Sequence, residues 1–250
     1  MTLSATPEPP GIRAVSASAI ATHNFRFYDF AMAAFCTILI CSNLIGAGKA
    51  ATFDVPVIGP VVFGAGILFF PLSYVLGDVL TEVYGYARAR RVVWAGFGAS
   101  IFAAFMAWAV VTMPAAPDWT GQEALAAVFG QVPRIFLASI LAFWAGEIAN
   151  AFVMARMKLL TKGRWLWTRT IGSTVVGQGV DSLIFYPLAF YGVWKTSLVI
   201  QVLVTNYLLK VLWEVVLTPV TYQIVARFKA AEGLDVFDTS TDFTPFRTKI

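Results

Sequence analysis

Charge is scarce in this chain. Asp, Glu, Lys and Arg make up 13% of its 250 residues, whereas 58% are hydrophobic and the mean hydropathy is +0.73. A soluble domain carries about 25% charged residues. This deficit, together with apolar runs of roughly 20 residues, excludes an ordinary soluble domain and indicates a polytopic membrane protein. The net charge of +4 is therefore no sign of nucleic-acid binding.

Histidine and cysteine are rare, which excludes several kinds of active site. His23 is the sole histidine and precedes the first apolar run, so no cysteine–histidine or serine–histidine pair can form in the spans, and there is no HExxH motif. Cys36 and Cys41 would point to different faces of one helix, so no disulfide between them is expected, and we expect both to be buried structural thiols. The chain also lacks a GxxxxGK[ST] loop, so any use of ATP would need a partner. We expect that the protein is not an enzyme and uses no cofactor. An acid-only hydrolase is the enzyme alternative left open.

Six apolar segments predict six transmembrane helices in an all-α fold. Their approximate bounds are 28–47, 58–84, 92–113, 132–154, 171–191 and 197–225. Residues 28–226 are therefore expected to form the transmembrane domain, with residues 1–27 as a mobile cytoplasmic tail and residues 227–250 as a polar cytoplasmic tail. The first tail lacks a long apolar core, so a cleavable signal peptide is not expected. Pro71, Pro187 and Pro219 lie inside predicted spans, where each removes a backbone hydrogen bond and favours a kink.

The distribution of Lys and Arg orients these spans. With the N-terminus in the cytoplasm, the inner segments hold fourteen of these residues and the outer loops hold two, Lys49 and Lys195. Arg88, Arg90 and Arg91 would form one of the inner loops. Cytoplasmic loops of membrane proteins are enriched in Lys and Arg. The alternation predicts a multi-pass protein of the cell inner membrane with both termini in the cytoplasm.

Polar side chains fall inside four predicted spans at spacings of three or four residues, which place them on one helix face. They are Asp78 and Glu82, Glu147 and Asn150, Gln178 and Asp181, and Asn206, Lys210 and Glu214. A charge at the bilayer centre costs about 2.5 to 3.5 kcal/mol on insertion scales, so these groups should face inward. One interpretation is a structural core in which Lys210 neutralises Glu214, Asp181 or Glu147. The other is a polar cavity that binds a polar solute.

The residue types suggest which solute such a cavity would bind. Acids outnumber the single cation, and a carboxylate can accept two adjacent N–H donors. Gln178 or Asn206 supplies both a donor and an acceptor. An aromatic face for stacking a flat ring could come from Phe185, Tyr186 or Trp213. Asp181 or Glu147 is also a candidate proton carrier, because burial favours the protonated form of an acid.

Three stretches resemble the queuosine precursor transporter family, also called the vitamin uptake transporter family. They are FPLSYVLGDVLTEVYGYARARRV at 70–92, GQGVDSLIF at 177–185 and EGLDVFDTSTDFTPF at 232–246. The resemblance implies a six-span inner-membrane protein that imports 7-deazaguanine precursors of the tRNA base queuosine. It points to four positions in particular: Asp78, Glu82, Gln178 and Asp181.

The residues and the resemblance together predict a transporter that works without ATP and binds a flat purine-like base. The substrate-binding residues expected are Asp78, Glu82, Glu147, Asn150, Gln178, Asp181, Asn206 and Lys210. A substrate-capturing subunit that needs a separate ATPase module is the alternative. The expected partners are the 7-deazaguanine base and the lipid bilayer; a homo-oligomer is allowed, and neither nucleic acid nor a metal ion is expected.

Overall fold

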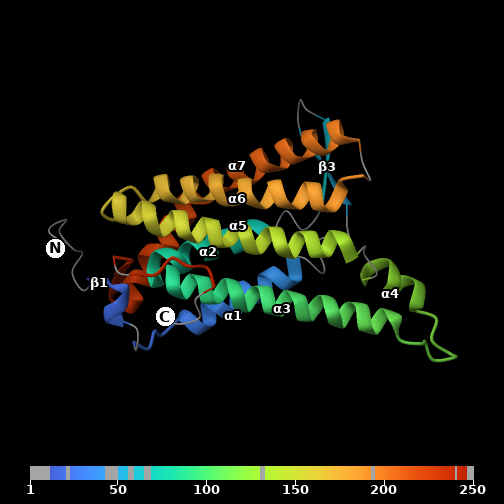
Figure 1. The fold of residues 1–250 in the computed structure, drawn as a ribbon, viewed down its shortest axis with the longest axis horizontal. Coiled ribbons are helices and arrows are strands. Elements are labelled where there is room, and N and C mark those ends of the chain that lie inside the picture. The colour runs from blue at the N-terminus through green and yellow to red at the C-terminus, as the bar shows by residue number, and fades with distance from the viewer. Residues whose placement is uncertain are drawn as a thin grey trace.

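The computed structural model describes residues 12–20, 23–42, 50–55, 59–64, 69–129, 133–192, 195–239 and 241–246. This part of the chain is mostly helical (Figure 1). Its seven α-helices are α1 (Tyr28–Cys41), α2 (Phe70–Tyr84), α3 (Tyr86–Thr112), α4 (Gln122–Phe129), α5 (Pro133–Leu160), α6 (Leu166–Phe190) and α7 (Thr196–Glu232). Four strands, β1 (Arg13–Ser16), β2 (Ala50–Val55), β3 (Gly59–Gly64) and β4 (Leu234–Phe237), and a 3-10 turn at Ala17–Ile20 complete it.

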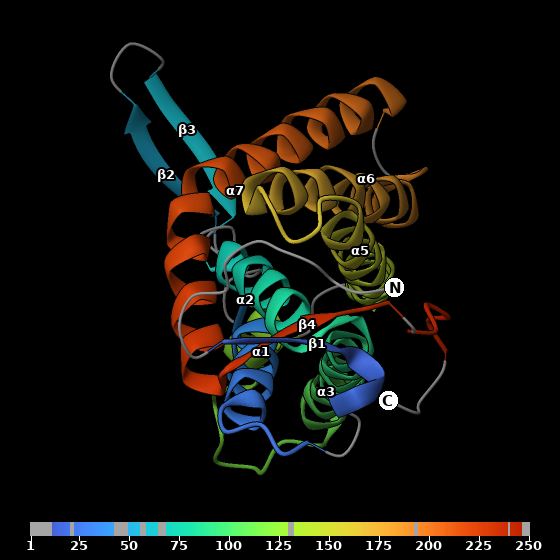
Figure 2. The same cartoon turned by 90° about the vertical axis from the view of Figure 1, so that its left-hand side faces the viewer.

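Helix α2 lies at the centre of the helical bundle (Figure 2). It contacts α1, α3, α5, α7 and β4, and most of its side chains are buried. Val79 and Val83 of α2 form the apolar core with Phe35 and Leu39 of α1, all with 0–1% of their surface exposed. Helix α2, which carries Asp78 and Glu82, is therefore surrounded by other elements of the bundle.

Three helices of the described part are long and apolar enough to cross a bilayer. They comprise Tyr86–Thr112, Leu137–Leu160 and Val202–Glu232, and Tyr28–Cys41 is a shorter apolar helix. Helices α3, α5 and α6 extend along the long axis of the molecule (Figure 1). Glycines allow α5 and α6 to pack closely, because a Cβ on Gly146 would lie 2.9 Å from the Gly177 carbonyl oxygen and a Cβ on Gly177 equally close to that of Gly146.

Two of the three prolines lie inside helices as predicted, and one does not. Pro187 interrupts α6 and Pro219 interrupts α7. Figure 2 shows that α7 changes direction along its length, and Pro219 leaves the carbonyl of Val215 without an intrahelical partner. Pro71 instead occupies the first turn of α2. The predicted kink is wrong there, because a proline at the start of a helix removes an N–H that has no intrahelical acceptor.

Several predicted element boundaries are also wrong, and the fold is not purely α-helical. β2 and β3 form an antiparallel hairpin where a loop and the start of the second span were expected, so that span's helix begins at Phe70. The 114–131 loop contains α4. Arg88, Arg90 and Arg91 lie in the first turns of α3, since Gly85 alone separates α2 from α3. Short apolar runs do not distinguish strand from helix by pattern, which explains the error at β2 and β3.

The prediction of a mobile N-terminal tail is wrong for residues 13–20, which form a strand and a 3-10 turn. β1 pairs in parallel with β4, from Arg13 opposite Leu234 to Ser16 opposite Phe237. The two tails therefore meet at one end of the bundle, which we call the β1–β4 end. The Arg88 guanidinium fixes the 3-10 turn by donating to the Ile20 carbonyl at 2.6 Å.

The C-terminal segment after β4 packs against the start of α3. Both carboxylate oxygens of Asp238 accept from the backbone N–H of Tyr86 at 3.1 Å. Burial raises the pKa of the Asp238 carboxyl above its ordinary value, although hydrogen bonds from Thr241 and the Tyr86 N–H oppose this. Arg90 donates to the carbonyls of Asp242 and Thr244. Residues predicted to form a solvated tail are thus part of the packed structure.

Candidate functional site

Polar side chains of the bundle are arranged in three levels along α2. Tyr74, Asp78 and Glu82 recur every four residues, so they share one face and are separated by about 6 Å of helix rise. Each faces polar groups of α5, α6 or α7. We call these levels the Tyr74 tier, the Asp78 tier and the Glu82 tier; the last lies nearest the β1–β4 end.

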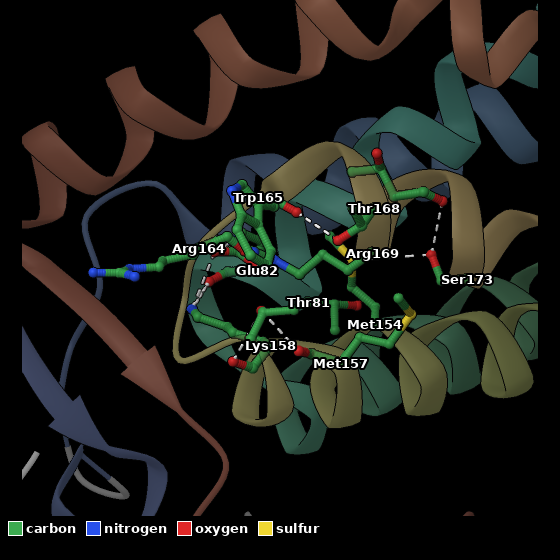
Figure 3. Close-up of polar contacts among 12 residues, drawn as sticks. Thr81, Glu82, Met154, Met157, Lys158, Arg164, Trp165, Thr168, Arg169 and Ser173 are labelled. Atoms are coloured by element: carbon green, nitrogen blue, oxygen red, sulfur yellow. Dashed lines mark hydrogen bonds and ion pairs between the residues drawn. The ribbon is translucent and has the colours of Figure 1, made fainter. Parts of the chain in front are cut away.

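The Glu82 tier is an ion-pair cluster around one buried carboxylate (Figure 3). Glu82 is 0% exposed. The Arg169 guanidinium forms a bidentate contact with it, donating from Nε to Oε2 and from Nη2 to Oε1, each at 2.7 Å. Lys229 Nζ lies 2.6 Å and Lys158 Nζ 3.3 Å from Oε1. This bidentate geometry gives the strongest kind of carboxylate–arginine contact.

Strand β4 joins the same cluster. Asp235 accepts from Lys158 at 2.7 Å and from Lys229 at 2.8 Å. Lys158 also donates to the backbone carbonyls of Glu82 at 2.6 Å and Val236 at 2.7 Å. Three cations and two carboxylates therefore tie together α2, α5, α6, α7 and β4 at the β1–β4 end.

The Asp78 tier has the opposite character, because its acceptors outnumber its donors. Asn150 Nδ2 donates to Asp78 Oδ1 at 2.8 Å. Gln178 lies next to Gly177, where α6 packs on Asn150. Four buried oxygens of this tier have no hydrogen-bond partner among the described residues: Asp78 Oδ2, Asn150 Oδ1, Gln178 Oε1 and Glu214 Oε1. A buried acceptor without a donor is costly, so the tier is suited to a guest that supplies N–H or O–H groups.

The Tyr74 tier is an ion pair with partial exposure. Lys210 Nζ lies 2.5 Å from Asp181 Oδ2, and these side chains are 20% and 14% exposed. The Tyr74 hydroxyl interacts electrostatically with this pair and with Glu147. Glu147 also lies against the backbone of α2, since a Cβ on Gly77 would come 2.8 Å from Glu147 Oε2.

The structure therefore brings together part of the predicted site and separates the rest. Asp78, Asn150, Gln178, Glu147, Asp181 and Lys210 occupy the adjacent Asp78 and Tyr74 tiers. Glu82 is instead engaged by three cations. Asn206 donates to the Tyr186 hydroxyl at 2.6 Å, farther from the β1–β4 end. Of the three neutralising partners considered for Lys210, Asp181 is the one observed.

Two groups of residues were missed by sequence reasoning. Glu214 was recognised as a polar residue of its span but left out of the binding set, although its four-residue spacing from Lys210 placed it on the same face. Lys158, Arg169 and Lys229 were counted among the fourteen basic residues of the inner segments. Their position close to span ends gave no sign that they fold back onto Glu82.

Two cavities lie in the described part of the molecule near these helices. The larger, about 420 Å³, is lined by apolar side chains of α1, α3 and α4, including Ile40, Phe102 and Met106. The smaller is a narrow gap that reaches Glu147 beside Gly77 and Thr81 and has no room for a water molecule. Neither matches the polar cavity that the sequence predicts, because the first is lined by apolar side chains and the second is too narrow for a base. The polar tiers are thus packed together in this conformation.

Long apolar helices that enclose charged and amide side chains are typical of a multi-pass membrane protein. Residues 64–224 match the family model described as "Putative vitamin uptake transporter". The chain belongs to this family, whose related members are named as queuosine precursor transporters.

Three such relatives illustrate the similarity. The "Probable queuosine precursor transporter" of Bacillus subtilis is 31% identical over 73% of this chain and 78% of its own length. The "Queuosine precursor transporter" of Escherichia coli is 27% identical over 60% of this chain and 67% of its own. A protein of Haemophilus influenzae, also named "Probable queuosine precursor transporter", is 25% identical over 50% and 51%. No solved structure matches the chain.

Proposed function

We propose that this protein imports 7-deazaguanine precursors of queuosine across the cell inner membrane and binds the flat base at the Asp78 tier. The observation that carries this proposal is the set of buried oxygens that have no hydrogen-bond donor among the residues that the structure describes. The deazaguanine edge has a ring N–H beside an exocyclic amino group. One carboxylate can accept from both, and Asp78 is buried on the central helix with one oxygen unoccupied.

The neighbouring residues have complementary roles in this proposal. The carbonyl oxygens of Asn150 and Gln178 accept further N–H groups of the base, and the Gln178 amide donates to its ring carbonyl. Lys210 and Asp181 form the entrance, because they are the exposed members of the site. Glu147 lines the passage between the tiers. Tyr186, oriented by Asn206 and close to Lys210 and Asp181, offers an aromatic face at the entrance.

Glu82 serves a different purpose in this scheme. The six spans are α1, α2, α3, α5, α6 and α7, and the β1–β4 end faces the cytoplasm, in accord with the distribution of Lys and Arg. The Glu82 tier then closes the cytoplasmic side, while the Tyr74 tier lies toward the outside. Import requires these helices to separate at the Glu82 tier after the base has bound, as expected for alternating access.

Binding of the nitrile form of 7-deazaguanine to the purified protein tests this proposal. Asp78→Asn removes one acceptor, and loss of a charge-assisted hydrogen bond worth about 1.5–3 kcal/mol predicts an affinity about 10- to 100-fold lower. Asp29→Asn is the matched control, because Asp29 is exposed in the first turn of α1. An unchanged affinity in Asp78→Asn would remove that residue from the site.

Uptake of the labelled base by proteoliposomes distinguishes this function from the alternative of a subunit that needs an ATPase module. Uptake by the purified chain alone would exclude a strict requirement for such a module. Binding without uptake would favour the alternative.

A further inference from the structure

Glu214 is a buried acid that the base-binding proposal does not use. It lies in α7, one helical turn from Lys210 toward the β1–β4 end, and is 2% exposed. The Thr174 hydroxyl of α6 hydrogen-bonds to its carboxyl. Its Oε1 atom has no hydrogen-bond partner among residues that the structure describes.

The charged groups facing Glu214 are mostly of the same sign. Asp78 of α2 and Glu147 of α5 both interact electrostatically with it. Asp181 of α6 is paired with Lys210, the nearest cation of α7. Within the described ranges, Asp78, Glu147 and Glu214 form no ion pair with Lys or Arg. Keeping three buried carboxyl groups ionised is costly when no Lys or Arg of the described residues lies at ion-pair distance from them.

The amides beside these acids point to the same missing ligand. Asn150 Oδ1 and Gln178 Oε1 belong to side chains that are 5% exposed, and neither oxygen has a donor in the described part of the chain. A carboxylic acid O–H is such a donor. The Asp78 tier therefore lacks hydrogen-bond donors for these oxygens as well as positive charge.

We propose that Glu214 is the proton-binding site that couples entry of the base to the proton gradient, an inference that rests on the proposed transport function. In the conformation open to the outside, an O–H bond forms between the Glu214 carboxylate and a proton from external water. In the conformation open to the cytoplasm, that bond breaks and the proton passes to internal water. Asp78 has a different task, because its Oδ1 accepts from Asn150 and its Oδ2 is the acceptor proposed for the base.

Two features of the fold provide for release of the proton on the cytoplasmic side. The Glu82 tier holds three cations against two carboxylates, so its net positive charge favours an ionised Glu214 once water enters. Pro219 frees the carbonyl of Val215, the residue after Glu214, which weakens α7 beside this acid. A bend there moves Glu214 relative to Thr174 when α7 separates from the Glu82 tier.

Proteoliposomes containing the purified chain test the coupling. The membrane potential is held at zero, and two rates are compared for the labelled nitrile form of 7-deazaguanine: accumulation driven by an acidic exterior, and exchange for unlabelled base at equal pH. One proton per base predicts about tenfold accumulation across a gradient of about one pH unit. Glu214→Gln should lower the ratio of accumulation to exchange to the value seen without a gradient. Thr221→Ala should keep the wild-type ratio, because that hydroxyl is bonded within α7 to the Leu217 carbonyl.

Each alternative result has a defined meaning. Accumulation by the wild type that ignores the proton gradient, or follows a sodium gradient at equal pH, would overturn the proton site while leaving base transport intact. If Glu214→Gln still couples base accumulation to the proton gradient as the wild type does, the proton site is overturned also. If Glu214→Gln loses exchange and Glu214→Asp restores neither rate, the residue is structural and the proposal fails. Absence of any base entry in the wild type would overturn both this proposal and the proposed function.

Discussion

Asp78 and Glu82 lie one helical turn apart on the same face of α2, yet their surroundings have opposite electrostatic character. Glu82 contacts Arg169, Lys158 and Lys229. Asp78 contacts the Asn150 amide and forms no ion pair in the described part of the protein. Two acids that look equivalent in sequence thus have different surroundings: one joins five elements through ion pairs, and the other is the acceptor that we propose for the base.

The Glu82 tier should dominate the stability of the β1–β4 end. Glu82→Gln leaves buried cations without their carboxylate, and breaking a buried ion pair typically costs about 3–5 kcal/mol. We expect a markedly lower midpoint of thermal unfolding in detergent. Glu123→Gln on the exposed surface of α4 is the control and should change little. Equal midpoints for both variants would show that the cluster does not stabilise the fold.

Gly85 should tolerate no side chain at the turn between α2 and α3. Its φ of 84° is rarely adopted by other residues, and a Cβ would lie 3.1 Å from Val236 Cγ1 and 3.2 Å from Asp238 Oδ1. The strain of such a backbone conformation costs about 1–3 kcal/mol, so Gly85→Ala should lower the thermal midpoint. Gly98→Ala in α3, where a Cβ meets nothing within 4 Å, should keep or raise it. The reverse order would contradict the turn geometry.

Asp181 and Lys210 should behave as a coupled pair. Lys210→Gln leaves Asp181 without its cation and Asp181→Asn leaves Lys210 without its anion, so each single variant should lose stability. The double variant removes both charges and should recover part of the loss, with a coupling energy of about 0.5–3 kcal/mol. Unfolding midpoints of the four proteins complete this cycle. Simple addition of the two single effects would argue against the 2.5 Å ion pair.

The sequence predicted the transmembrane helices better than their connections. Helices α3, α5 and α7 follow from apolar runs that are as long as a bilayer is thick. The β1–β4 pair could not be predicted, because its strands are four residues each and lie at opposite ends of the chain. Arg88 and Arg90 were predicted to lie in a cytoplasmic loop because arginines are common there. In the structure they bind backbone carbonyls of both tails.

The inward position of these polar residues was predictable, but their arrangement was not. Helical spacing correctly placed Asp78, Glu147 and Asp181 on inward faces. Spacing also put Glu82 on the same face as Asp78, and it carries no information on which distant cations reach that carboxylate. Arg169 and Lys229 become its partners only when α6 and α7 pack against α2.

In the proposed transport function, Asp78 accepts hydrogen bonds from the N–H edge of the base. The most direct measurement compares the affinities of wild-type protein and Asp78→Asn for 7-deazaguanine and for its analogue without the exocyclic amino group. The wild type should bind the analogue about 10- to 100-fold more weakly, since the charge-assisted hydrogen bond is worth about 1.5–3 kcal/mol, and Asp78→Asn should discriminate far less between the two. Equal discrimination in both proteins would show that another residue recognises this edge of the base.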